Sequence, residues 1–282
     1  MKVAIVTDST CDYPQSLLAE REIHMVPLSV IFGEETFLDH VEITPARFYE
    51  KMASSSQLPS TSQPSPADFS AMYEKLAAAG YDHIVSVHIS AVLSGTYNSA
   101  HIAASSRPIP VTVVDSKSAS LGLGFVLDAA VAARDAGGSA SDVSMACYNA
   151  MEDLQIFFIL ETMDNLVRGG RAGKAAGLAA SLLNIKPILT LVDGAVSPWS
   201  KAKGRKRAFQ AMALNIEAMS EEKGPLKAAL LHAVDPEGAA QLRAAIEETE
   251  ADVEFSEPQI IGPVIGTHVG PGAVGIAVMP RS

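Results

Sequence analysis

The stretch "KVAIVTDS" (residues 2–9) decides the fold class. Its apolar, β-branched run ends in polar residues, a pattern typical of a buried strand in a parallel sheet. Further runs that indicate strands are "HMVPLSVIF" (24–32), "HIVSVHI" (83–89) and "PVTVVDS" (110–116). Helical segments separate these runs, and this alternation predicts a parallel sheet flanked by helices.

The helical segments of this half carry start and stop signals. Thr44 with Pro45, and Ser65 with Pro66, each combine an N-cap residue with proline at the first helical position. The helices expected here cover 14–22, 44–53, 65–80, a segment beginning near Ser94, 124–138, and a segment capped by Ser141 that runs toward Leu154.

The second half changes character. A strand (155–160) precedes helical segments around 162–184, and "KPILTLVDGAVSPW" (186–199) predicts a hairpin that turns at Asp193–Gly194. A basic helix, a strand (226–234), a helix (236–250) and strands over 252–258 and 274–280 follow. We therefore expect two α/β domains, 1–150 with the parallel sheet and 151–282 with a mixed sheet and helices.

Composition narrows the function classes. The 282 residues are 48% hydrophobic and 19% charged, enough for a real core. A net charge of −11 argues against a sequence-independent nucleic-acid binder. Two cysteines make no disulfide framework, the N-terminus does not resemble a signal peptide, and no apolar stretch is long enough to span a bilayer. We expect a cytoplasmic protein without stable membrane insertion.

Four polar or glycine-rich clusters are candidates for binding. They are "LPSTSQPSP" (58–66) with Thr61 and Ser62, "LSGTYNSA" (93–100) with Ser94, Gly95 and Thr96, "VDSKSASLGLG" (114–124), and "GPVIGTHVGPGAVG" (262–275) with His268. Ser94, Gly95 and Thr96 are expected at a helix N-terminus, which favours an anion. Each cluster also has a plainer explanation, as turn hydroxyls, a helix cap or turn glycines. Three of them follow strands, where open α/β sheets bind ligands.

Familiar catalytic and metal-binding motifs are missing. The chain has no G-x-S-x-G elbow, "GGRAGK" (169–174) lacks P-loop spacing, and no Cys/His metal spacing occurs. We therefore predict no catalytic residue, no metal and no cofactor. Two alternatives stay open: a phosphotransferase or hydrolase that uses Ser94 with His88 or His268 as base, and a regulatory or scaffold protein.

Basic residues gather in two places in this acidic chain. Arg168 and Arg171 flank Gly169–Gly170, and "KAKGRKR" (201–207) contains Lys201, Lys203 and Arg205. A solvated helix start is the plainer interpretation of the second run. Its contrast with the overall charge also indicates a docking surface for an acidic partner or a phosphate.

Taken together, the motifs resemble those of the DegV family, a bacterial group of fatty-acid-binding proteins. The matching segments cover nearly the whole chain in the family's order: "TDSTCD" (7–12), "PLSV" (27–30), "STSQPSP" (60–66), "LSGTYNSA" (93–100), "VDSKSASLGLG" (114–124), "LVRGGR" (166–171), "LLNIKPIL" (182–189), "GAVSPWSKAKGRKRA" (194–208) and "IGPVIGTHVGPGAVG" (261–275). Together these motifs are specific, although each is weak alone.

The resemblance implies a binding protein rather than an enzyme. A long-chain fatty acid such as palmitate would lie in an apolar tunnel between two α/β domains. Its carboxylate would be bound by Thr61, Ser62, Ser94, Gly95 and Thr96, with His268 at the same end.

The resemblance also implies a partner. A separate ATP-dependent fatty acid kinase would phosphorylate the bound acid for phospholipid synthesis, docking at Arg171, Lys201, Lys203 and Arg205. Relatives often carry Arg where this chain has Lys203, which sets the docking segment apart from the family pattern.

Overall fold

The computed structural model describes residues 2–105, 108–178 and 185–281. The chain divides into two compact units. Unit 1 consists of Met1–Glu152 with Gly262–Val264, and unit 2 of Asp153–Ile261 with Ile265–Ser282. Each unit is built around its own sheet.

Unit 1 contains the predicted parallel sheet. Its strands are β1 (Val3–Asp8), β2 (Ile23–Val26), β6 (His83–His88) and β7 (Val111–Asp115), in the order β2-β1-β6-β7. Each adjacent pair is parallel. Because all four strands run the same way, the loops that leave their carboxyl ends gather along one edge of the sheet.

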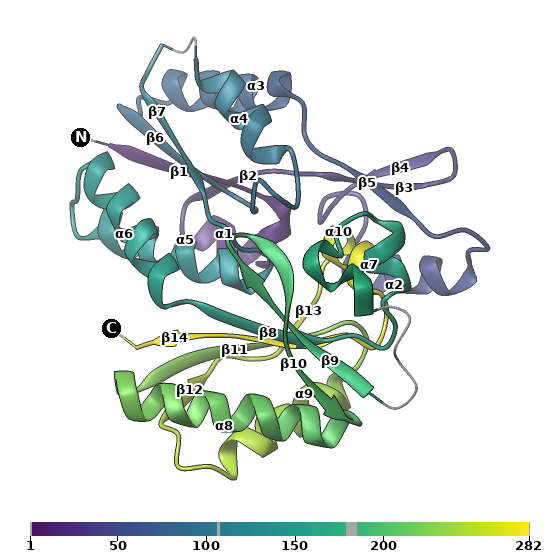
Figure 1. Ribbon diagram of the computed structural model, residues 1–282. Helices are drawn as coiled ribbons and strands as arrows, with labels where there is room; N and C mark the ends of the chain where they lie inside the picture. The colour runs from purple at the N-terminus through teal and green to yellow at the C-terminus, as the bar shows by residue number, and fades with distance from the viewer. Residues whose placement is uncertain (1, 106–107, 179–184, 282) are drawn as a thin grey trace. The chain divides into compact units, whose positions relative to one another are not determined.

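Helices cover both faces of this sheet (Figure 1). α3 (Pro66–Ala78) and α4 (Thr96–Ala104) pack on one face, and α5 (Leu121–Asp135) contacts β1 and β6 from the other. The core under α3 and α4 consists of Ala4, Val6, Val26, Phe69, Tyr73, Leu76, Ile84, Ala100 and Ala103. Alternate residues of β1 thus face opposite helical layers, and the predicted parallel sheet flanked by helices is confirmed.

The extended run over 24–32, in which Pro27 indicates an edge or a bulge, is not one continuous strand. It divides into β2 and β3 (Ser29–Phe32), which belong to different sheets. Pro27 lies between them, and proline has no N–H with which to continue a ladder. β3 forms a small antiparallel sheet with β4 (Glu35–Leu38) and β5 (Ser60–Ser62), which the sequence analysis did not predict.

The remaining helices of unit 1 are η1 (Ser9–Cys11), α1 (Gln15–Glu20), α2 (Pro45–Ser54) and α6 (Ala140–Asp153). Thr44 and Ser65 cap α2 and α3 as predicted. α6 is capped by Ser139 and not by Ser141: Ser139 Oγ accepts from Asp142 N at 3.3 Å, and the Asp142 carboxylate accepts from Ser139 N at 2.8 Å. This reciprocal pair is a capping box, which satisfies two backbone donors at once.

Unit 2 contains the mixed sheet. Its strands are β8 (Gln155–Ile159), β9 (Ile185–Val192), β10 (Ala195–Lys203), β11 (Leu226–His232), β12 (Val253–Phe255), β13 (Gln259–Ile260) and β14 (Val274–Pro280). The order is β10-β9-β8-β14-β11-β12, with β13 also on β11. The pairs of β11 with β12 and β13 are parallel and the others antiparallel.

The predicted hairpin and helices of unit 2 are also found. Asp193 and Gly194 form the β9–β10 turn with φ of 50° and 79°, the positive values that a type I′ turn requires. α8 (Arg205–Lys223) and α9 (Pro236–Glu247) lie together along the sheet (Figure 1). The shorter helices are α7 (Asp164–Arg168) and η2 (Gly173–Leu178), and α10 (Pro263–Val269) belongs to unit 2 from Ile265 onward. The helical segments expected around 162–184 are found as α7 and η2, and residues 179–184 lie outside the described residues.

The basic run 201–207 is not one helix start. β10 continues through Lys203, and Gly204, with φ of 83°, separates the strand from α8, which begins at Arg205. Lys201 and Lys203 are therefore strand residues on β10. Among the described residues, no helix is both long enough and apolar enough to cross a bilayer.

Candidate functional site

The hydroxyl pair Thr61–Ser62 lies in β5 rather than in an irregular loop. In the antiparallel ladder Thr61 is opposite Val30, and Ser62 is opposite Ser29. Pro59 and Pro64 are buried on either side of the strand. Thr61 is half-buried and Ser62 exposed. The ladder and the two buried prolines together fix the backbone that carries the hydroxyl groups.

Ser94, Gly95 and Thr96 lie where α4 begins, after the carboxyl end of β6. Gly95 is the N-cap residue and has no side chain to occupy the cap. Ser94 Oγ lies 2.9 Å from Thr96 Oγ1, and Thr96 is buried. The first-turn N–H groups of a helix carry positive partial charge, so this helix start favours a carboxylate.

Gln63 joins these two segments. Its Nε2 donates to Ser99 Oγ in the first turns of α4 at 3.0 Å. A Cβ at Gly95 would lie only 2.0 Å from Gln63 Oε1, so the amide rests against the Gly95 backbone. The structure thus brings the Thr-Ser-Gln segment and the Ser-Gly-Thr segment together. Gln63 belongs to the first polar cluster of the sequence, but its motif alone indicates no role for it.

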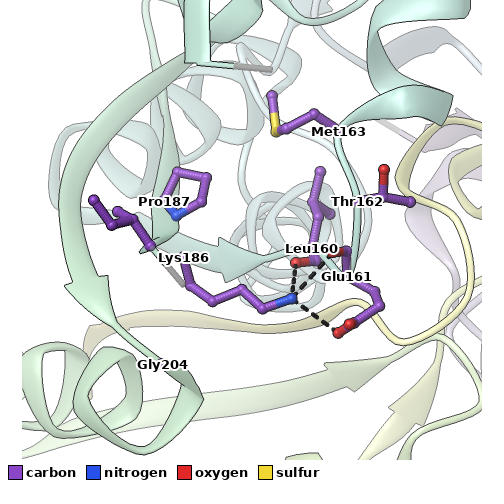
Figure 2. Close-up of a pocket in the computed structure, with 8 residues that line it drawn as sticks. Leu160, Glu161, Thr162, Met163, Lys186, Pro187 and Gly204 are labelled. Carbon is purple, nitrogen blue, oxygen red and sulfur yellow. Dashed lines mark hydrogen bonds and ion pairs between the residues drawn. The ribbon is translucent and has the colours of Figure 1, made fainter. Parts of the chain in front are cut away.

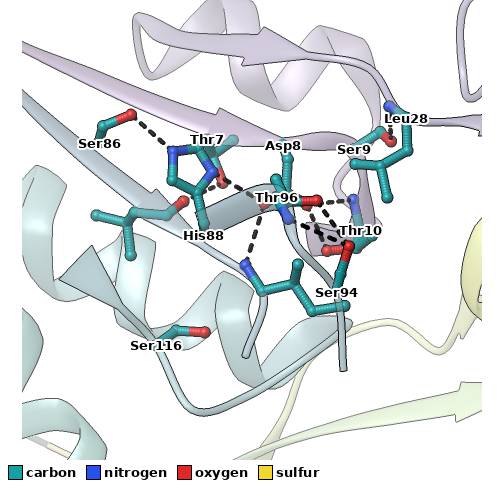
Figure 3. Close-up of polar contacts among 12 residues, drawn as sticks. Thr7, Asp8, Ser9, Thr10, Leu28, Ser86, His88, Ser94, Thr96 and Ser116 are labelled. Carbon is teal, nitrogen blue, oxygen red and sulfur yellow. Dashed lines mark hydrogen bonds and ion pairs between the residues drawn. The ribbon is translucent and has the colours of Figure 1, made fainter. Parts of the chain in front are cut away.

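A buried chain of polar groups crosses the sheet beside this helix start. His88 Nδ1 lies 3.0 Å from Asp8 Oδ2, and His88 Nε2 lies 2.7 Å from Ser86 Oγ. Tyr73 OH donates to the same Ser86 Oγ at 2.9 Å. Figure 3 shows the His88 ring lying between Asp8 and Ser86. Asp8 also accepts from Ile89 N and Thr10 N, so the chain holds β1, β6 and α3 together.

These hydrogen bonds argue against the hydrolase alternative, because they leave His88 unable to act as the base for Ser94. Both ring nitrogens of His88 already have partners, and His88 and Ser86 are fully buried. An acid, imidazole and hydroxyl in this order resemble a catalytic triad, but a nucleophile must reach its substrate. His88 is therefore not the base that Ser94 would need.

A second cluster of buried polar side chains comes from the segments that follow β1 and β4. His40 Nε2 lies 3.6 Å from Asp12 Oδ1 and 4.0 Å from Asp39 Oδ1. Asp12 also accepts from Gly262 N at 3.1 Å and from the Ser120 hydroxyl. Burial raises the pKa of Asp39 to about 7, even though the charge of His40 acts in the opposite direction. No motif spacing in the sequence pointed to this cluster.

His268 lies in α10, in unit 2, with its ring close to Gly169: a Cβ at Gly169 would be 2.3 Å from His268 Nδ1. Burial, assisted by the charge of Arg171, lowers the pKa of His268 to about 4. The imidazole is therefore neutral at physiological pH. Arg171 Nη1 donates to Gly169 O at 2.6 Å.

The basic residues differ in how they are held. Lys201 and Lys203 are exposed on β10. Arg205 instead forms an ion pair with Asp235, the N-cap residue of α9, and lies 5.3 Å above the Phe209 ring. Arg205 therefore stabilises the α8–α9 contact, whereas the two lysines project into solvent.

A hollow of about 210 Å³ lies beside the start of β9. It is lined by Leu160, Glu161, Thr162, Met163, Ile185, Lys186, Pro187 and Gly204. Lys186 Nζ donates to Leu160 O, Glu161 O and Glu161 Oε2 at 3.4, 3.0 and 3.0 Å (Figure 2). Its three N–H groups are thus used within the protein. The volume is below the ~300–1,000 Å³ of typical ligand pockets.

Among the described residues, neither a reactive thiol nor a metal-binding cluster is found. Cys11 and Cys147 are buried free thiols, and burial raises the pKa of both. Within residues 2–105, 108–178 and 185–281, no group of three or more His, Cys, Asp or Glu side chains could hold a metal ion.

Comparison with known proteins gives matches over the full length. The model of the family described as "Uncharacterised protein, DegV family" matches residues 2–281. Protein DegV of Bacillus subtilis (strain 168) is 35% identical over 278 residues, covering 98% of each chain.

Solved structures match as well. One is described as "Fatty Acid Binding of a DegV family Protein from Thermus thermophilus", with a TM-score of 0.94, 36% identity and coverage of 100% of both chains. Another, "DegV, a fatty acid binding protein from Bacillus subtilis", has a TM-score of 0.91, 34% identity and the same coverage. Both solved proteins are thus described as binding fatty acids.

Proposed function

The chain belongs to the DegV family, which confirms the resemblance of its motifs, and on this basis we propose that it binds a long-chain fatty acid. The acyl tail lies in an apolar tunnel and the carboxylate is held by neutral donors. The protein acts as a carrier and not as an enzyme. The solved relatives that are described as fatty-acid-binding proteins support this proposal.

The tail supplies most of the affinity. A long-chain acid has about a dozen methylenes, and burying each contributes ~0.8 kcal/mol, a gross gain on the order of 10 kcal/mol before ordering costs. Chain length and shape are therefore selected by the apolar walls. The head group needs only to be placed.

One observation carries the head-group proposal: Gln63 joins the hydroxyl strand β5 to the first turn of α4 within unit 1. Thr61, Ser62, Ser94, Gly95 and Thr96 supply hydroxyl and backbone N–H donors there, without a positively charged side chain among them. His268 is a further proposed ligand of the carboxylate, as a neutral imidazole. Such donors fix a carboxylate and leave it accessible to a phosphoryl donor.

The partner proposed is an ATP-dependent fatty acid kinase. It phosphorylates the bound acid to an acyl phosphate for phospholipid synthesis, in the cytoplasm. Lys201 and Lys203 support this role because they are exposed cations in a chain with a net charge of −11. Arg171 and Arg205 complete the proposed docking surface, although both also make contacts within unit 2.

Native mass spectrometry of the protein purified from cells tests the central proposal. We expect a co-purified mass equal to one long-chain fatty acid, and saturable binding of palmitate or stearate after delipidation. Absence of both would refute the carrier. Turnover of ester or phosphate substrates by the delipidated protein would instead support the hydrolase or phosphotransferase.

A further inference from the structure

In unit 2, Asn165 connects α7 to α10. Asn165 is 7% exposed, and its Nδ2 donates to Thr267 O at 3.2 Å. On its other side, a Cβ at Gly270 would lie 3.0 Å from Asn165 Oδ1. The amide is thus enclosed by the last turn of α10 and the glycine that follows it. His268 is the next residue after Thr267, so this hydrogen bond fixes the backbone that carries the imidazole.

Gly169 makes room for the imidazole itself. A Cβ there would be 2.3 Å from His268 Nδ1 and 3.0 Å from Asn165 O. Its φ of −70° is one that any residue adopts, so glycine is required at this position for its size. Gly169 N also donates to Asn165 O at 2.9 Å, which ties the glycine to the residue that holds α10.

Arg171 completes the arrangement. Its Nη1 donates to Gly169 O at 2.6 Å, and its backbone N donates to Leu166 O at 3.0 Å. The guanidinium and the imidazole therefore both contact Gly169. A shift at this one residue would move the imidazole and the guanidinium together.

We propose that Asn165 and Gly169 are positioning residues: they fix the His268 imidazole, buried, beside the Arg171 loop. The inference rests on the proposed function, in which His268 is one of the residues assigned to the bound fatty acid. A larger residue at 169 would expel the ring, and loss of the Asn165 donor would release α10. Either change would return the imidazole to water, where it can take up a proton.

The test combines two readouts on three variants. Gly169→Ala adds a methyl group against the ring, and Asn165→Asp replaces the donor to Thr267 O with an acceptor at constant shape. Gly177→Ala is the matched control, because a Cβ there meets no heavy atom within 4 Å. Histidine ring NMR titrations follow His268, assigned by comparison with His268→Gln. Palmitate binding to delipidated protein is measured in parallel.

In the wild type and the control, we expect the His268 ring not to titrate between about pH 5.5 and 8. In Gly169→Ala or Asn165→Asp, the ring should titrate within this range, and palmitate affinity should fall by about ten-fold. A silent His268 ring in every folded variant, or unchanged affinity in a variant whose ring titrates, would overturn the inference. If the wild type binds no fatty acid, the proposed function fails, whereas the ring titration still decides how His268 is held.

Discussion

The Gln63 side chain rests on the backbone of Gly95: a Cβ at residue 95 would lie 2.0 Å from Gln63 Oε1. The two residues belong to different segments, one leaving β5 and one opening α4. Any side chain at residue 95 would collide with the Gln63 amide in its present position.

Gly95→Ala should weaken fatty-acid binding with little loss of stability. The φ of Gly95 is −73°, which alanine adopts, and Gln63 is a flexible exposed side chain that can move away. Its movement breaks the Gln63–Ser99 hydrogen bond and disturbs the donors around the head group. We expect a several-fold loss of palmitate affinity by calorimetry and a melting temperature within about 4 °C of the wild type.

A double-mutant cycle separates this effect from a general one. If Gly95→Ala acts through Gln63, adding it to Gln63→Ala should cost little further affinity. Additive losses would show that the methyl group disturbs binding by another route.

The paired variant Thr61→Ala with Ser94→Ala tests the hydroxyl donors. A hydrogen bond to a charged group contributes about 1.5–3 kcal/mol, so losing two should reduce fatty-acid affinity by about a hundred-fold or more. Both side chains are half-buried, and the fold should be retained, as circular dichroism can check. Ser144→Ala, whose hydroxyl donates to Ser141 O within α6, serves as control. Undiminished acid in lipid extracts of the double variant would contradict the proposed head-group site.

Much of the fold could be predicted because its signals are local. Alternating strands and helices, the Asp193–Gly194 turn and the Thr44 and Ser65 caps all follow from neighbouring residues. β4 and β5 could not, since such short strands exist only through their pairing with β3. That residues 1–150 and 151–282 fold as separate domains stays a prediction, because compactness is not independent folding.

The candidate site, like the fold, could be predicted from the sequence only in part. Its hydroxyl groups were visible in the motifs, whereas the contacts of Gln63 with Gly95 and of Asn165 with Thr267 join residues 32 and 102 positions apart. No periodicity or spacing encodes such contacts. The same is true of the Asp12–His40–Asp39 cluster, which forms only when the segments after β1 and β4 meet.

Charge reversal should separate docking from stability within the basic run. Lys201→Glu and Lys203→Glu change exposed strand residues, so the free energy of unfolding should move by less than about 0.5 kcal/mol. Phosphorylation of the bound acid by a cognate kinase should slow several-fold because the attraction to the kinase is lost. Lys75→Glu, an exposed change on α3, is the charge-matched control. Wild-type phosphorylation rates in both β10 variants would refute docking at this strand.

Arg205→Glu should behave differently from the lysine variants. It would place a carboxylate against Asp235, whose pKa is lowered, despite partial burial, by hydrogen bonds from Arg205 and Gly238 N. The N-cap of α9 then faces a like charge, and we expect a loss of about 1–3 kcal/mol in the free energy of unfolding. Urea unfolding measures this loss. Equal stability of Arg205→Glu and Lys203→Glu would show that the ion pair contributes nothing.

Stability should fall as the pH rises from about 4 to about 7, because of Asp39. Burial raises the pKa of Asp39 to about 7 from 3.8, and His40 contributes in the same sense, since Asp12 and Asp39 raise its pKa against the effect of burial. Between the unfolded pKa of Asp39, 3.8, and its folded pKa of about 7, the folded state binds a proton at Asp39 that the unfolded chain has released. The stabilisation is therefore complete below about pH 4 and is lost by a pH above 7. The loss should be on the order of a few kcal/mol.

Asp39→Asn should remove most of this slope, since an amide does not ionise and keeps the shape of the buried side chain. The free energy of unfolding in urea, measured from about pH 5 to pH 8, is expected to fall in the wild type and to stay nearly level in the variant. Asp135→Asn changes a carboxylate that is 60% exposed and should leave the wild-type slope in place. Equal slopes in Asp39→Asn and the wild type would mean that Asp39 is ionised in the folded protein throughout this range, and that its burial is compensated by its neighbours.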